Sequence, residues 1–77
     1  MPRHKLTDPF VRAIRPDGVR RIRYWDTVVD GLVLQVEPRS GHRSYKLYYR
    51  RHGRARWYTI APAGRLGLKE AREEARR

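Results

Sequence analysis

The sequence contains no cysteine among its 77 residues, which excludes a disulfide framework and any zinc site built from thiolates. It also lacks a long apolar run, so it has neither a membrane-spanning segment nor the hydrophobic stretch of a secretory signal peptide. A chain of this length can form one small domain with a modest core. These absences favour a single soluble, intracellular domain over residues 1–77 that works by binding.

Acidic residues are scarce as well. The chain has eight Asp and Glu residues and nineteen Lys and Arg residues, which give a net charge of +11. Sixteen of the basic residues are Arg, whose planar guanidinium suits phosphates and guanine edges. No acid occurs between Glu37 and Glu70. A charge run is often only a solvated surface, but a surface this basic repels itself unless a polyanion lies against it. We therefore expect an anionic macromolecule as partner.

Turn residues divide the chain into a short helix, four strand-like runs and a second helix. Thr7 can cap a first helix of about two turns, which Pro16 ends and in which Phe10 and Ile14 face a core. Alternation of apolar and polar residues in three of the runs predicts an antiparallel meander with one buried face. Asp26 closes the first run, where an acid is normally a turn or cap residue. The strands are expected at 21–26, 32–37, 43–50 and 54–60.

Apolar residues change to helical spacing from Leu68 onward. Leu68, Ala71 and Ala75 then share one side of a helix, and Arg72 turns outward. The expected fold class is therefore α+β. It comprises a short N-terminal helix, a three- to four-stranded antiparallel sheet and a C-terminal helix packed on one sheet face, after a mobile basic lead of residues 1–5.

The two faces of the predicted sheet differ in chemistry. The C-terminal helix would cover the apolar face and leave the other face bare. A ribbon of two or three strands fits the major groove of duplex DNA, where polar side chains meet base edges, while arginines at the strand ends reach phosphates. The bare face would carry Gln35, Ser44, Lys46, Tyr48, Arg50, Trp57 and Thr59. The strand ends and turns would carry Arg39, Arg43, Arg51, Arg54 and Arg56.

Some features of the sequence are also compatible with partners other than duplex DNA. Exposed aromatics such as Tyr48 and Trp57 can stack on single-stranded bases, so a module that binds RNA or the ribosome stays open, as does a protein-interaction domain with an acidic partner. The histidines His4, His42 and His52 fall in a tail and two loops, and no pair of acids has a convincing spacing. We therefore expect no catalytic residue, no metal, no cofactor and no small-molecule substrate.

Six short motifs occur in a characteristic order along the chain. They are Leu6–Asp8, Tyr24–Asp26, Gly31–Val36, Ser44–Arg50, Gly53–Arg56 and Leu68–Arg72. On these motifs, residues 6–77 resemble the N-terminal DNA-binding domain of tyrosine-recombinase integrases from prophages and integrative elements.

The resemblance implies a function and a context. The family's domain lays a three-stranded sheet in the major groove of arm-type sites, which flank the recombination core, so the partners implied are double-stranded DNA and other integrase protomers. By position, Gln35, Lys46, Tyr48, Arg50 and the Arg54/Arg56 hairpin would face DNA. The chain would be the front module of a longer recombinase in the bacterial cytoplasm, associated with the nucleoid. Because the catalytic domain would lie elsewhere, this chain alone should not cut DNA.

Overall fold

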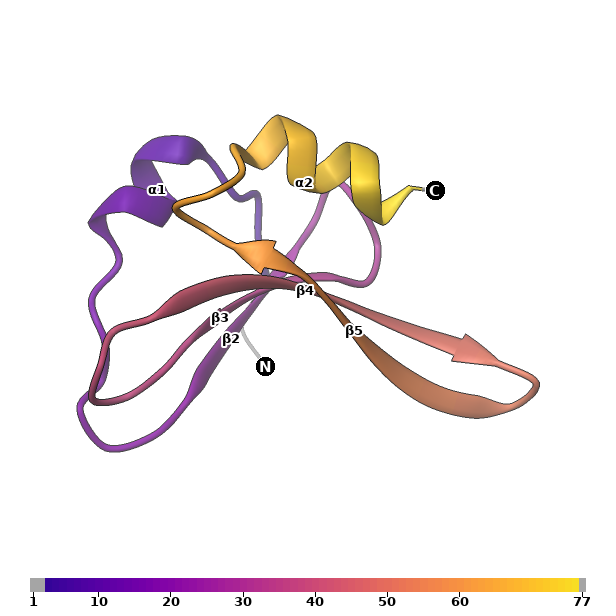
Figure 1. Cartoon of the computed structure of the whole chain (residues 1–77), viewed down its shortest axis with the longest axis horizontal. Helices are drawn as coiled ribbons and strands as arrows, with labels where there is room; N and C mark the ends of the chain where they lie inside the picture. Colours follow the sequence, from indigo (N-terminus) through magenta and orange to yellow (C-terminus); the bar gives the residue numbers. More distant parts are fainter. Residues whose placement is uncertain (1–2, 77) are drawn as a thin grey trace.

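In the computed structural model, which describes residues 3–76, both helices lie on the same face of a twisted sheet (Figure 1). The strands follow one another across the sheet in chain order, and the α+β class and the antiparallel meander of the last four strands are confirmed. Met1 and Pro2 of the expected lead, and Arg77, lie outside the described residues. The elements are β1 (Arg3–His4), α1 (Asp8–Ala13), β2 (Ile22–Asp26), β3 (Leu32–Val36), β4 (Arg43–Arg51), β5 (Arg54–Pro62) and α2 (Leu68–Ala75).

The sheet has one strand more than the sequence predicts, and that strand makes it a mixed sheet. Arg3 and His4, expected in a mobile lead, form β1 and pair in parallel with Trp25 and Asp26 of β2. The backbone N–H of Thr27 also donates to the carbonyl oxygen of His4 at 3.0 Å. Two residues are too few to show any alternation, so only the pairing in three dimensions reveals this strand.

Helix α1 begins where the sequence predicts. The hydroxyl of Thr7 accepts a 3.2 Å hydrogen bond from a backbone N–H of the first turn, and Pro9 occupies that turn, where a missing N–H is tolerated. At the other end, the guanidinium of Arg43 donates to the carbonyl oxygens of Val11 at 2.6 Å and Arg12 at 3.0 Å. Arg43 thereby satisfies carbonyls that the helix leaves unpaired and lies on the helix side of the sheet.

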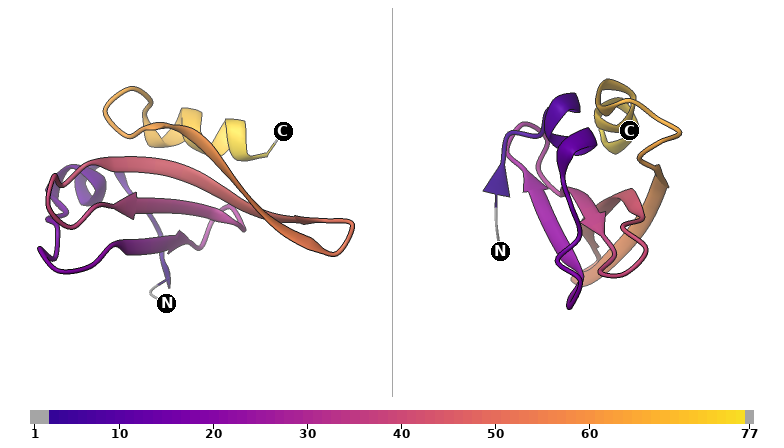
Figure 2. Two further views of the ribbon diagram at one scale, coloured as in Figure 1. Left: turned by 60° about the horizontal axis from the view of Figure 1, so that its bottom comes forward. Right: turned by 90° about the vertical axis from the view of Figure 1, so that its left-hand side faces the viewer.

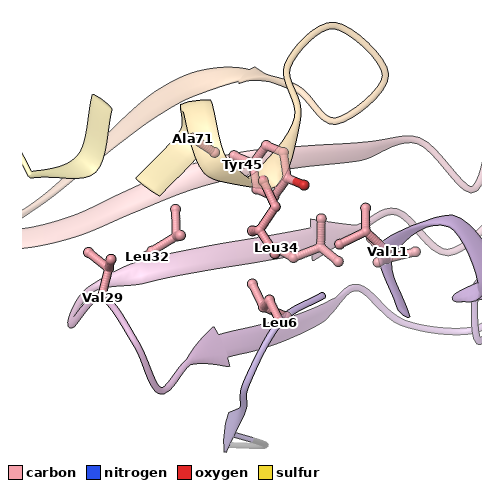
Figure 3. Packing of buried hydrophobic residues seen from close by; sticks show 9 residues of the cluster. Leu6, Val11, Val29, Leu32, Leu34, Tyr45 and Ala71 are labelled. Carbon is pink, nitrogen blue, oxygen red and sulfur yellow. The ribbon is translucent and has the colours of Figure 1, made fainter. Parts of the chain in front are cut away.

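The core fills the space between the two helices and the sheet face beneath them (Figure 3). Leu68 and Ala71 of α2 are buried in it and Ala75 packs against it, which confirms the expected docking of the C-terminal helix. Tyr45 of β4 is the largest fully buried side chain, and burial raises the pKa of its hydroxyl to about 12. The buried cluster is Leu6, Val11, Val29, Leu32, Leu34, Val36, Tyr45, Leu68 and Ala71.

Strands β4 and β5 form a hairpin that is longer than the rest of the sheet. β3 pairs with β4 only from Val36–Arg43 to Leu32–Leu47, whereas β5 continues to pair as far as Arg51–Arg54. The distal half of the hairpin therefore projects away from the body of the molecule (Figures 1 and 2). His52 and Gly53 at its tip both have positive φ, at 53° and 77°, as a tight two-residue turn that matches the strand twist requires.

A buried carboxylate joins the N-terminal segment, β2 and α2. Asp26 is 1% exposed, and its oxygens accept hydrogen bonds from the backbone N–H groups of Leu6 and Val29, both at 3.1 Å. Arg72 of α2 donates to the same carboxylate from Nε at 3.0 Å and from Nη2 at 3.1 Å. Its Nη2 also donates to the carbonyl oxygen of Leu6 at 2.8 Å.

The outward orientation expected for Arg72 is therefore wrong, and Asp26 is more than a turn residue. Asp26 does cap a turn through Val29, but its buried charge also requires a counterion, which the long side chain of Arg72 supplies from the edge of α2. Burial by itself would raise the pKa of Asp26, but the hydrogen bonds from Arg72, Leu6 and Val29 together hold the pKa below its ordinary value. The carboxylate is thus charged at neutral pH.

Asp26→Asn should unfold most of the protein. The change keeps the shape of the side chain but leaves Arg72 without its buried counterion, and breaking a buried pair from one side costs about 3–5 kcal/mol. That loss is comparable with the whole stability of a domain this small, roughly 3–5 kcal/mol. Circular dichroism should show the loss of cooperative melting. As a matched control, Asp30→Asn removes a fully exposed carboxylate 3.6 Å from Arg3 and should leave the melting temperature nearly unchanged.

Acid should destabilise the parent partly through Asp26. Since its pKa is lowered in the folded state, its contribution to the free energy of unfolding is complete above the ordinary pKa of about 3.9. That contribution is lost as the pH falls below the ordinary pKa and through the lowered folded-state pKa. Urea titrations in sucrose, which favours the folded state, should give a shallower pH dependence for Asp26→Asn than for the parent. Equal slopes would show that another acid carries the effect.

Candidate nucleic-acid interface

The sheet face opposite the helices, here called the outer face, gathers the polar residues that alternation predicts there. Residues opposite one another in register point to the same side of a sheet, so the strand pairings place every member. All seven residues expected on this face lie on it. Over β2 to β5, the outer face consists of Arg23 and Trp25 from β2, Val33 and Gln35 from β3, Ser44, Lys46, Tyr48 and Arg50 from β4, and Ala55, Trp57, Thr59 and Pro62 from β5.

Part of the outer face is buried rather than bare, which corrects the sequence-based expectation. Val33 is 0% exposed and Gln35 is 5% exposed, although neither faces the helices. The reason is β2, whose large side chains Arg23 and Trp25 lie directly beside Gln35 and Val33 in register. The outer face therefore has a small packed layer of its own.

Three aromatic side chains form the centre of this layer and are called the aromatic cluster. The ring centroids of Trp25 and Tyr48 are 5.5 Å apart, those of Tyr48 and Trp57 are 5.0 Å apart, and those of Trp25 and Trp57 are 5.9 Å apart. Trp57 still exposes 41% of its surface. The cluster thus packs internally, while part of the Trp57 ring stays exposed to solvent. Sequence reasoning missed Trp25, whose place follows only from its register with Val33.

A chain of polar contacts joins β2 to β3 on the outer face and continues to Glu37 and Arg21. The side-chain oxygen of Gln35 accepts a 3.0 Å hydrogen bond from Nε of Arg23, and its Nε2 donates to Glu37 at 2.8 Å. The carboxylate of Glu37 also accepts from Nε of Arg21 at 3.2 Å. The hydrogen bond from Gln35 and the charge of Arg21 lower the pKa of Glu37. The amide of Gln35 is therefore engaged at both ends, and Arg21 is paired with an acid.

The remaining predicted residues spread along the hairpin and the loops. Lys46 donates from Nζ to the hydroxyl of Thr59 at 2.8 Å across the β4–β5 pair, while Ser44 is buried. Arg50 is exposed on the outer face, and Arg51 and Arg54 form the last pair before the turn. The predicted phosphate contacts that are exposed are Arg39, Arg51, Arg54 and Arg56. Arg56 opposes Tyr49 on the side away from Lys46, and Arg43 holds α1.

A second surface feature is a cleft of about 850 Å³ beside the root of the hairpin. Its apolar lining comes from Leu47, Tyr49 and Tyr58 and reaches Trp25 and Tyr48 at the margin of the outer face. Its charged lining has both signs, with Arg3 and Arg50 against Asp30 and Glu74. A mixed lining of this kind does not favour a polyanion, so the outer face and the hairpin are the better candidates for one.

Comparison with known proteins identifies the family of the chain. Among residues 3–76, no group of His, Asp and Glu side chains could hold a metal ion, and no helix is long and apolar enough to cross a membrane. No curated protein matches the sequence. A family model described as "Arm DNA-binding domain" matches residues 6–77. The matched segment includes both helices, strands β2 to β5 and therefore every residue of the outer face.

Proposed function

The chain belongs to the family of arm DNA-binding domains, the DNA-binding modules of integrases, and on this premise we propose that its outer face binds double-stranded DNA in the major groove at arm-type sites. The observation that carries the proposal is the projecting β4–β5 hairpin. It lies within a stretch that has no acid between Glu37 and Glu70, and it extends beyond β3 without a covering helix.

The shape of the hairpin supports groove binding. A two-stranded ribbon fits the major groove, which is about 12 Å wide in B-form DNA. Both helices lie on the inner face, the sheet face opposite the outer face (Figure 2), so neither helix stands between the ribbon and the bases. The strands β2 and β3 would then lie beside the hairpin and widen the contact.

Different residues suit different parts of the duplex. Lys46 and Arg50 lie on the outer face along β4, where donors can meet base edges. The arginines of the turns and the hairpin tip suit phosphates on either side: Arg39, Arg51, Arg54 and Arg56. We leave Arg43 out of the interface because it binds the end of α1. Gln35 is buried with its amide bonded at both ends, which favours a positioning role over direct base contact.

The packing of the aromatic cluster favours duplex DNA over single-stranded RNA. Proteins that read single strands offer free aromatic faces on which bases stack. Here Trp25, Tyr48 and Trp57 contact one another, and the guanidinium carbon of Arg23 lies over the ring of Trp57 at 4.5 Å from its centroid. These contacts occupy much of the surface that a stacked base would need.

We also propose that the parent protein is a site-specific recombinase and that other integrase protomers bind beside this domain at neighbouring sites. The family description names a binding domain and not a catalytic one, so cleavage of DNA is assigned to a separate domain. A DNA partner of this kind implies a cytoplasmic location at the bacterial nucleoid.

Duplex DNA should bind with a steep salt dependence. If roughly 4–6 phosphates are neutralised, log K should fall against log salt with a slope of about −4 to −5. Fluorescence anisotropy with a labelled random-sequence duplex measures the slope. Single-stranded RNA of equal length and a polyglutamate peptide should compete poorly at the same charge concentration. Stronger competition by either would support that partner instead, and affinity that does not change with salt would contradict the electrostatic part of the proposal.

Lys46→Ala and Arg50→Ala should weaken DNA binding without lowering the melting temperature. A side chain bonded to a base edge should lose roughly 1–3 kcal/mol and some discrimination between sequences. A phosphate contact should instead lose affinity for all sequences and flatten the salt slope by about one unit. Lys69→Ala is the matched control, because it removes an equal charge from an exposed position on α2. An equal loss in the control would mean that only total charge matters.

A further inference from the structure

Arg23 stands out on the outer face, although no sequence pattern singles it out. It projects from β2, and its guanidinium carbon lies 4.5 Å from the ring centroid of Trp57 on β5. These two strands are separated by β3 and β4, so the two side chains reach toward each other across the middle of the outer face. Its Nε donates to Gln35 at 3.0 Å. The guanidinium is thus held at a central place on the surface proposed to meet DNA.

The hydrogen-bonding capacity of the Arg23 guanidinium is only partly used by the described residues of the protein. A guanidinium carries five N–H donors, and within residues 3–76 only the Nε–H of Arg23 has an acceptor. The four N–H groups on Nη1 and Nη2 are therefore unused. Two parallel donors among them match the O6 and N7 acceptors that guanine presents in the major groove.

Among residues 3–76, Arg23 forms no ion pair with an acid, in contrast with Arg21. Arg21 contacts the carboxylate of Glu37 at 3.2 Å, whereas the partner of Arg23 is the neutral amide of Gln35. The NH₂ group of Gln35 donates to the carboxylate of Glu37 at 2.8 Å. The side-chain oxygen of Gln35 therefore faces Arg23. The acid thereby orients Gln35 without neutralising Arg23.

The support around the guanidinium restricts its motion before any ligand binds. Trp57 lies against it, and the buried Gln35 fixes its Nε. A side chain that is already ordered loses less conformational entropy when it forms a specific contact. This arrangement suits a residue that reads a base, whereas the phosphate contacts proposed above come from exposed arginines at turns and at the hairpin tip.

We propose, on the basis of the function proposed above, that Arg23 recognises a guanine in the major groove and that Gln35 and Trp57 are positioning residues for its guanidinium. The central location of Arg23 on the outer face favours a base over a phosphate. The arm-type site of this domain should accordingly contain a guanine–cytosine pair opposite β2, beside the bases that β4 contacts.

The first experiment identifies the site and the residue together. A random-sequence duplex library is selected with the parent, with Arg23→Lys and with Arg21→Lys. Arg23→Lys keeps the charge but loses the planar fork, so it should lose the preference for one guanine that the parent and Arg21→Lys share. Arg21→Lys is the matched control, since it makes the same exchange two residues away at an arginine that is already paired with Glu37.

The second experiment removes one acceptor atom from the DNA. Each guanine of the selected duplex is replaced in turn by 7-deazaguanine, which lacks N7. At one position the parent should lose roughly tenfold in affinity, and Arg23→Lys should be insensitive there. Gln35→Met, which removes the orienting amide, should reduce the loss at this position while leaving the salt slope unchanged. Thermal melting of each variant confirms that it is folded.

The outcomes separate this inference from the function on which it rests. If the parent binds duplex DNA with the expected salt dependence but Arg23→Lys keeps the same guanine preference, the role of Arg23 is wrong and groove binding stands. If Arg23→Lys loses affinity equally for all sequences, Arg23 is a phosphate contact and the inference is also overturned. If the parent does not bind duplex DNA, the proposed function and the inference fail together.

Discussion

The pairing of Asp26 with Arg72 is the contact on which the rest of the structure depends. The carboxylate is buried at the end of β2 and receives hydrogen bonds from Leu6, Val29 and Arg72, so it joins the N-terminal segment, the turn after β2 and the C-terminal helix. A charge so deeply buried is tolerated only when it is paired and fully hydrogen-bonded. Because it holds α2 against the inner face, the outer face is left free of helices.

The outer face combines three features in a small area. The aromatic cluster forms its apolar centre, and the hairpin extends beyond the rest of the sheet. Its arginines differ in whether a neighbouring acid neutralises their charge. Arg21 is paired with Glu37, whereas Arg23 is held by the neutral amide of Gln35 and by Trp57. A surface with this organisation can do more than attract phosphates, since ordered donors beside an apolar patch suit the acceptors and methyl groups of a major groove.

Much of the fold could be predicted because its signals are local. Alternation in β3, β4 and β5 assigned each residue to a face, and the cap at Thr7 marked the start of α1. Seven of the candidate site residues were thereby placed together on one face. The prediction failed for β1, which is too short for a pattern, and for Arg72, whose inward orientation depends on Asp26, 46 residues away. It also missed Arg23 and Trp25, because β2 shows no clear alternation of its own.

The sequence by itself determined the composition of the domain, the order of its elements, the separation of apolar from basic faces, and the motifs by which its family is recognised. These properties follow from periods of two or about four residues and from the excess of arginine. Only the tertiary structure decided which arginines are already engaged, which are free, and how deeply Gln35 is buried. Such contacts depend on strand register and on helix docking, which bring together residues that are distant along the chain and that no local pattern can pair.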